Sequence, residues 1–223
     1  MIPIAAVQPL TLSDFPGRPA AIVFLAGCNW RCVYCHNRRL WEAAEPALAE
    51  DAVLADLERR RGLITGAVIS GGEPTLCAEL PAFLERLRAL GLAVKLDTNG
   101  SQPARLQAVL EAGLVDYVAL DLKAEESRHD ALTGSRAEFP LVRRALALLR
   151  AQRVPYELRT TVCGELHDEA GLRALLAELL PGERWWLQAC RPPPGTRLSP
   201  PDPRLLARIA AEARARGVRA EIR

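Results

Sequence analysis

The chain has 223 residues, of which 49% are hydrophobic and 25% are charged, so it can bury a sizeable core and we expect one domain spanning residues 1–223. Lys and Arg number 29 against 27 Asp and Glu, and the net charge of +2 argues against a chain that coats nucleic acid or an anionic membrane. The sequence contains neither an apolar run long enough to span a bilayer nor a basic amino-terminal segment followed by an apolar stretch. We therefore expect a cytoplasmic location.

Short apolar or β-branched runs alternate with longer Ala-, Leu- and Arg-rich segments of helical period. The expected strands, in chain order, are 21–26, 67–70, 93–97, 117–121, 156–162 and 185–189, with 2–7 and 218–222 as further candidates. The expected helices are roughly 48–60, 79–90, 103–111, 139–152, 168–180 and 203–216. Repeated strand-then-helix units predict an α/β fold with a parallel sheet, either open and doubly wound or a partial barrel, because each parallel pair needs a crossover connection.

Six cysteines without an export signal argue against a disulfide framework, because a reducing cytoplasm keeps thiols free. Cys28, Cys32 and Cys35 follow the strand 21–26 within one short loop, which can wrap three thiolates around one centre. A structural zinc needs a fourth ligand, whereas a four-iron cluster on three cysteines leaves one iron open to a substrate. The spacing favours iron–sulfur and leaves zinc or plain packing as alternatives. The scattered cysteines are expected to pack as small buried hydrophobes: Cys77, Cys163 and Cys190.

Glycines and polar residues follow the next expected strands at their carboxyl ends. One strand runs into SGGEPT at 70–75, where two glycines let the backbone approach a ligand and Glu73 suits an ammonium group. The following strands end in LDTNG at 96–100 and LDLK at 120–123. Each segment alone also fits an ordinary turn or helix cap, but together they occupy the edge where parallel α/β folds build their sites. Weaker candidates near this edge are Arg159, Thr160 and Gln188.

Together, the segments CNWRCVYCHN, SGGEPT, LDTNGS and DYVALDLK resemble the radical S-adenosylmethionine superfamily, and within it the activators of glycyl radical enzymes. The opening LTLSDFPGRPAAIVFLAGCNWRC and the late LQACRPPPG are most similar to the activating proteins of anaerobic ribonucleoside-triphosphate reductase. The resemblance covers nearly the whole chain. Activators of pyruvate formate-lyase share several of these motifs, but their opening segment is glycine-rich where this chain has TLSDFPG.

The resemblance implies a partial (β/α)6 TIM-like barrel and a 4Fe-4S cluster whose metal ligands and catalytic residues are Cys28, Cys32 and Cys35. Its open iron would chelate the amino and carboxylate groups of S-adenosylmethionine. The residues implied to bind this cofactor are Tyr34, His36, Gly71, Gly72, Glu73, Asp97, Thr98, Asn99, Asp121, Lys123 and Gln188. In some activators of this kind a monovalent cation lies beside the methionine carboxylate. The resemblance leaves open whether Asp97, Thr98 and Asp121 hold such a cation here.

The implied reaction is reductive cleavage of S-adenosylmethionine, followed by removal of a hydrogen atom from a glycine of a partner enzyme. Anaerobic ribonucleoside-triphosphate reductase is the favoured partner, and a flavodoxin or ferredoxin is the implied electron donor. No cysteine occurs between His36 and Ser70, which excludes a ferredoxin-like insertion there. Three alternatives stay open: another glycyl radical enzyme such as pyruvate formate-lyase, a small molecule as in carboxy-deazaguanine synthases, or a zinc-stabilised binding module without catalysis.

Overall fold

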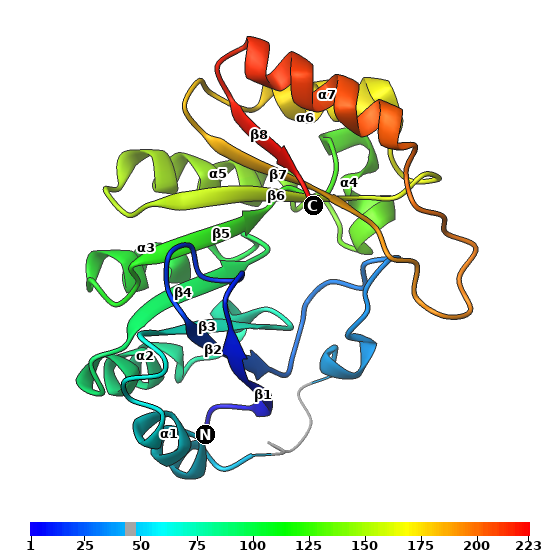
Figure 1. Ribbon diagram of the computed structural model, residues 1–223. Coiled ribbons are helices and arrows are strands. Elements are labelled where there is room, and N and C mark those ends of the chain that lie inside the picture. Colours follow the sequence, from blue (N-terminus) through cyan, green and yellow to red (C-terminus); the bar gives the residue numbers. More distant parts are fainter. Residues whose placement is uncertain (43–47) are drawn as a thin grey trace.

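The computed structural model describes residues 1–42 and 48–223, and its strands form one curved sheet (Figure 1). The sheet has eight strands in sequence order: β1 (Ile4–Thr11), β2 (Ala20–Leu25), β3 (Gly66–Gly71), β4 (Ala93–Thr98), β5 (Tyr117–Asp121), β6 (Tyr156–Val162), β7 (Arg184–Ala189) and β8 (Arg219–Ile222). β1 pairs antiparallel with β2, and every later pair is parallel. Within the described chain β1 and β8 are the two edges, so the barrel is not closed.

Helices connect the parallel strands and cover the outer side of the curved sheet (Figure 1). They are α1 (Glu50–Arg59), α2 (Leu80–Ala89), α3 (Pro103–Glu111), α4 (Glu126–Thr133), α5 (Phe139–Ala151), α6 (Glu169–Ala177) and α7 (Pro203–Ala215), with short 3-10 helices η1 (Arg38–Leu40) and η2 (Pro74–Leu76). No helix in residues 1–42 and 48–223 is both long and apolar enough to cross a bilayer.

The predicted fold class is confirmed: the strands β2 to β7 are each followed by at least one helix, as in a partial (β/α)6 barrel. Both further strand candidates are present, as β1 and β8. β1 runs antiparallel to β2 because the connection over residues 12–19 is too short for a crossover.

Helix α4 is an element that the periodicity did not predict. Its sequence, ESRHDALT, buries only His129, Leu132 and Thr133, so it has no long apolar stripe at helical spacing. Gly134, with φ of +68°, ends the helix in the left-handed conformation. The backbone N–H of Arg31 donates to the carbonyl oxygen of Thr133 at 2.7 Å. The carboxyl end of α4 therefore packs on the loop that follows β2.

Alternation of side chains gives the sheet two different faces, as β4 shows. Val94 and Leu96 are fully buried in the main hydrophobic core beneath the helices. Lys95 and Asp97 alternate with these two residues along the strand, so their side chains point to the opposite face. The face that turns away from the helices therefore carries charged side chains even where it is buried.

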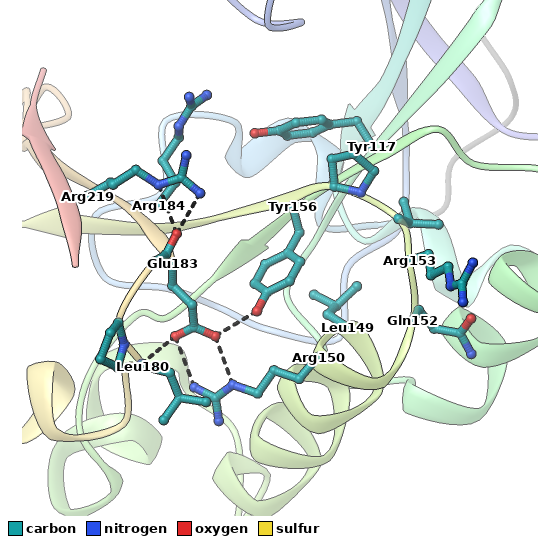
Figure 2. A pocket seen from close by; sticks show the side chains of 14 residues that line it. Tyr117, Leu149, Arg150, Gln152, Arg153, Tyr156, Leu180, Glu183, Arg184 and Arg219 are labelled. Atoms are coloured by element: carbon teal, nitrogen blue, oxygen red, sulfur yellow. Dashed lines mark hydrogen bonds and ion pairs between the residues drawn. The ribbon is translucent and has the colours of Figure 1, made fainter. Parts of the chain in front are cut away.

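A hollow of about 520 Å³ lies at the amino ends of β5 to β8 (Figure 2). Its wall holds Glu183, whose side chain is 6% exposed and whose carboxylate pairs with Arg150 Nε at 2.8 Å. The same carboxylate accepts hydrogen bonds from Tyr156 OH at 2.7 Å and from the backbone N–H of Leu180 at 2.7 Å. Burial opposes ionisation, but these partners outweigh it and hold the pKa of Glu183 below its ordinary value. Glu183 thus joins α5, β6 and the α6–β7 loop.

Replacing Glu183 by Gln should destabilise the protein by about 2 kcal/mol, because the side chain at position 183 is only 6% exposed and would lose its ion pair with Arg150. Urea unfolding at neutral pH measures this loss. The difference from wild type should shrink as the solution is acidified, since a carboxylate of lowered pKa gives stability that is lost on protonation. Glu126→Gln, which breaks an exposed pair with Arg143, is the control and should cost less than about 0.5 kcal/mol. Equal losses of unfolding free energy in the two variants would show that the buried Glu183 pair stabilises the fold no more than an exposed pair.

Candidate active site

A cavity of about 120 Å³ lies at the carboxyl ends of β2 to β6, on the opposite edge of the sheet from the hollow at Glu183. The predicted residues that line it are Cys28, Cys32, Tyr34, Cys35, Gly71, Gly72, Glu73, Asp97, Thr98, Asn99, Asp121 and Lys123. Arg159, one of the weaker candidates, also lines the cavity, and the other lining residues are Trp30, Asn37, Trp41 and Ser70. Three predicted residues lie outside the lining. His36 is exposed on its loop, and Gln188 faces the hydroxyl of Thr161 at 3.5 Å. The buried hydroxyl of Thr160 donates instead to the carbonyl oxygen of Leu122 at 2.7 Å.

The three clustered cysteines lie in the loop between β2 and η1. Gly27, with φ of +94°, turns the chain at the end of β2, and its N–H donates to the carbonyl oxygen of Leu40 at 2.8 Å. Cys32 is 7% exposed, and Cys28 and Cys35 are half-buried. The loop therefore brings three thiols to one cavity without exposing them fully to solvent.

Two of these thiols receive N–H groups. The backbone N–H of Trp30 donates to Cys28 Sγ at 3.4 Å, and Trp41 Nε1 donates to Cys35 Sγ at 3.3 Å. Hydrogen bonds of this kind tune the reduction potential of an iron–sulfur cluster. Burial raises the pKa of Cys28 to about 11, so this thiol keeps its proton at neutral pH.

The side chains of the described residues do not form a site for a single metal ion. Nowhere in residues 1–42 and 48–223 do three His, Cys, Asp or Glu side chains converge as ligands of one ion. The thiolates of a four-iron cluster bind separate irons, so they need not converge on one point. The described residues therefore offer no ready set of four ligands for a structural zinc.

Hydrogen bonds hold the cysteine loop in place, and three of the residues that make them were not predicted as site residues: Asn29, Trp30 and Glu138. Trp30 is fully buried, and its Nε1 donates to Glu138 Oε2 at 2.5 Å. Asn29 Nδ2 donates to the same oxygen at 3.2 Å, and Asn99 Nδ2 donates to Asn29 Oδ1 at 3.1 Å. No local pattern reveals this connection, because Glu138 lies 108 positions beyond Trp30 in the chain. The loop is thereby fixed between the start of α5 and the end of β4.

Gly71 and Gly72 line the cavity, and packing alone already requires glycine at both positions. A Cβ on Gly71, whose φ is +116°, would lie 2.4 Å from the carbonyl oxygen of Leu25. A Cβ on Gly72 would lie 2.1 Å from the carbonyl oxygen of Gly27. The loop after β3 therefore rests directly on the end of β2, next to the cysteines.

Glu73 connects the loops that follow β2, β3 and β4. Its N–H donates to the carbonyl oxygen of Gly27 at 2.8 Å. Its carboxylate accepts hydrogen bonds from Thr75 N at 3.0 Å, Thr98 Oγ1 at 2.8 Å and Asn99 N at 2.6 Å. The residue is only 2% exposed, and burial raises the pKa of its carboxyl group despite these donors. Glu73 thus holds together the backbone on which most of the cavity is built.

Two carboxylates and three cations meet on the face of the sheet below the cavity. Arg159 Nη1 lies 2.9 Å from Asp97 Oδ2, and Arg159 Nε lies 2.9 Å from Asp121 Oδ1. Lys95 Nζ pairs with Asp97 Oδ1 at 3.1 Å, and Lys123 Nζ with Asp121 Oδ2 at 3.0 Å. Burial opposes ionisation of both carboxyl groups, but the neighbouring cations outweigh it and hold the pKa of each below its ordinary value. Both carboxylates are therefore ionised.

The hydroxyl of Tyr34 is buried and has no hydrogen-bond partner among the described residues. Burial raises its pKa, so the group stays a neutral donor. Lys123 Nζ lies 5.7 Å from the centroid of the Tyr34 ring. A buried hydroxyl without a partner at the wall of a cavity fits a polar ligand that supplies the missing acceptor.

The model of the radical SAM superfamily matches residues 22–173 of this chain, which include the cysteine loop, Glu73 and the ends of β4 to β6. The chain belongs to the radical SAM superfamily. This membership implies a 4Fe-4S cluster and S-adenosylmethionine, and it argues against the zinc-stabilised module without catalysis. The clustered cysteines, the two glycines of the SGGEPT segment and the orphaned hydroxyl of Tyr34 are compatible with these groups.

Among its relatives is a candidate glycyl-radical enzyme activating enzyme of Methanocaldococcus jannaschii, 29% identical over 171 residues, which are 74% of this chain and 70% of the relative. A 7-carboxy-7-deazaguanine synthase of Hyperthermus butylicus is 42% identical over 93 residues, 40% of this chain and 38% of the relative. The pyruvate formate-lyase-activating enzyme of Clostridium pasteurianum is 30% identical over 138 residues, 59% of this chain and 57% of the relative.

Solved structures show the same fold. A radical SAM methyltransferase from Sphaerobacter thermophilus superposes with a TM-score of 0.75 at 17% identity, covering 96% of this chain and 68% of the methyltransferase. The likeness supports the architecture of the open partial barrel.

Glu138→Ala should lower the iron content of this radical SAM protein after anaerobic reconstitution. The change leaves Trp30 Nε1 and Asn29 Nδ2 without their acceptor and destabilises the cysteine loop by about 2 kcal/mol. Iron per chain and urea unfolding measure the two effects. Glu111→Ala, on the exposed side of α3, is the matched control and should retain wild-type iron. Equal iron retention in both variants would show that Glu138 does not position the loop.

Proposed function

We propose that this radical SAM enzyme activates a glycyl radical enzyme, with anaerobic ribonucleoside-triphosphate reductase as its target. The observation that carries the proposal is a cavity at the carboxyl ends of the strands with three cysteines in its lining. We propose Cys28, Cys32 and Cys35 as the cluster ligands, since three thiolates leave one iron of a 4Fe-4S cluster for a substrate. When bound, the cluster supplies one electron to the sulfonium of S-adenosylmethionine.

Side chains of this chain offer partners for both ends of S-adenosylmethionine. Glu73 Oε2 accepts a hydrogen bond from Asn99 N, which leaves a lone pair that supports the proposed pairing with the ammonium group. The free hydroxyl of Tyr34 supports a contact with the nucleoside end. Trp30 and Trp41 also line the cavity and limit the access of water, which a reactive radical requires.

The choice of target depends on the relatives and on the opening segment TLSDFPG. The relative from Methanocaldococcus jannaschii, whose name refers to glycyl-radical enzyme activation, matches 74% of this chain. We propose a flavodoxin or ferredoxin as the electron donor and closure of the cavity by the glycine loop of the partner. A second candidate is a reaction on a small molecule, because the synthase of Hyperthermus butylicus reaches 42% identity over its matched 93 residues.

Cys32→Ala should lose most of the cluster iron and the reductive cleavage of S-adenosylmethionine, because two thiolates hold a four-iron cluster poorly. Iron analysis and detection of 5′-deoxyadenosine after anaerobic reconstitution measure this. Cys163→Ala is the matched control, since Cys163 is fully buried and does not line the cavity. Wild-type iron in Cys32→Ala would overturn the ligand assignment.

The target is tested by incubating the reduced holoenzyme and S-adenosylmethionine with each candidate partner and recording the electron paramagnetic resonance spectrum. We expect a glycyl radical signal with anaerobic ribonucleoside-triphosphate reductase. A signal only with pyruvate formate-lyase would contradict the choice of target. Formation of 7-carboxy-7-deazaguanine, without a glycyl radical on any partner, would favour the second candidate.

A further inference from the structure

The guanidinium of Arg159 lies between the two carboxylates below the cavity. Its Nη1 is 2.9 Å from Asp97 Oδ2 and its Nε is 2.9 Å from Asp121 Oδ1. These side chains are 12% to 24% exposed, so the pairs are largely shielded from water. Asp97 and Asp121 are also two of the three residues that the sequence analysis left open as ligands of a monovalent cation.

Each oxygen of these two carboxylates faces a positive side chain. The outer oxygens lie near lysines. Lys123 Nζ donates to Asp121 Oδ2 at 3.0 Å, whereas Lys95 Nζ lies 3.1 Å from Asp97 Oδ1 as an ion pair only, because this oxygen accepts no hydrogen bond from the described residues. The inner oxygens, Asp97 Oδ2 and Asp121 Oδ1, both pair with Arg159. Three cations against two carboxylates leave no negative charge to attract a further cation.

The third open ligand, Thr98, is engaged as well. Its hydroxyl donates to Glu73 Oε1 at 2.8 Å and accepts from the backbone N–H of Gly100 at 3.1 Å. The side chains of Asp97, Thr98 and Asp121 in this structure therefore do not fit a bound sodium or potassium ion.

The excess positive charge is balanced on the other side of Lys95. Lys95 Nζ lies 3.2 Å from Glu157 Oε1, and both side chains are 2% exposed. Glu157 Oε2 in turn accepts hydrogen bonds from Trp186 Nε1 at 2.9 Å and Tyr117 OH at 3.2 Å. The alternating charges of β4, β5 and β6 thus form a neutral, buried set that does not require a metal ion.

We propose that Arg159 is a built-in cation of this site: its guanidinium takes the place that a monovalent metal ion would occupy between Asp97 and Asp121. A tethered guanidinium binds both carboxylates through separate N–H groups and cannot dissociate. Arg159 is in this account a positioning residue, which fixes the two carboxylates at the base of the cavity. The inference concerns the bare chain, so it does not depend on the proposed target enzyme.

The test compares urea unfolding of the bare chain in KCl, NaCl and choline chloride at equal concentration. The unfolding equilibrium constant of the wild type should be the same in the three salts. Arg159→Gln frees the two inner oxygens, so potassium or sodium should lower its unfolding constant by about tenfold relative to choline. Arg143→Gln is the matched control: Arg143 also bridges two carboxylates, Glu126 and Glu178, but at an exposed site. This control should show no preference among the salts.

A wild-type chain that is stabilised about tenfold by potassium or sodium over choline would overturn the proposal, as would an Arg159→Gln variant that responds like Arg143→Gln. Sodium NMR of the wild-type chain keeps the test decisive if Arg159→Gln does not fold. We expect the sodium resonance to show no broadening that added potassium reverses. If such broadening occurs and Asp97→Asn abolishes it, sodium binds at this site and the proposal is wrong. None of these measurements requires the cluster, S-adenosylmethionine or a partner enzyme.

Discussion

The buried carboxylate of Glu73 is the interaction on which the cavity depends. It accepts hydrogen bonds from the loops after β3 and β4, while its backbone N–H holds the loop after β2. A buried carboxylate is costly unless its acceptors are satisfied, so the three loops are stable only together. The cysteine loop follows directly from the segment that Glu73 holds. The position of the cysteine loop therefore depends on the packing of these loops against one another.

Parallel pairing made much of the site predictable from sequence. Strands of a parallel sheet end at one edge, so the segments that follow β2 to β5 had to meet there. The cysteine spacing and the SGGEPT and LDTNG segments each fall at such an end. Their positions in the lining of one cavity confirm that expectation, although the chemical role of each side chain stays a prediction.

The remaining features depend on contacts between distant parts of the chain. The pairing of Arg159 with Asp97 requires the register across β4, β5 and β6, which no single segment of sequence reveals. Glu138 reaches the cysteine loop across 108 positions, and α4 is stabilised by contacts rather than by an apolar stripe. Gln188 lies near the predicted edge, but its side chain faces Thr161 instead of the cavity.

The most direct test of this account is electron–nuclear double resonance of the reduced cluster with S-adenosylmethionine labelled in its methionine amino and carboxylate groups. The account predicts hyperfine coupling from both labels in the wild type, because three cysteines leave one iron open to the cofactor. It also predicts that the coupling persists in Cys163→Ala. A fully assembled cluster that binds the cofactor without coupling to either label would contradict the open iron at the carboxyl ends of these strands.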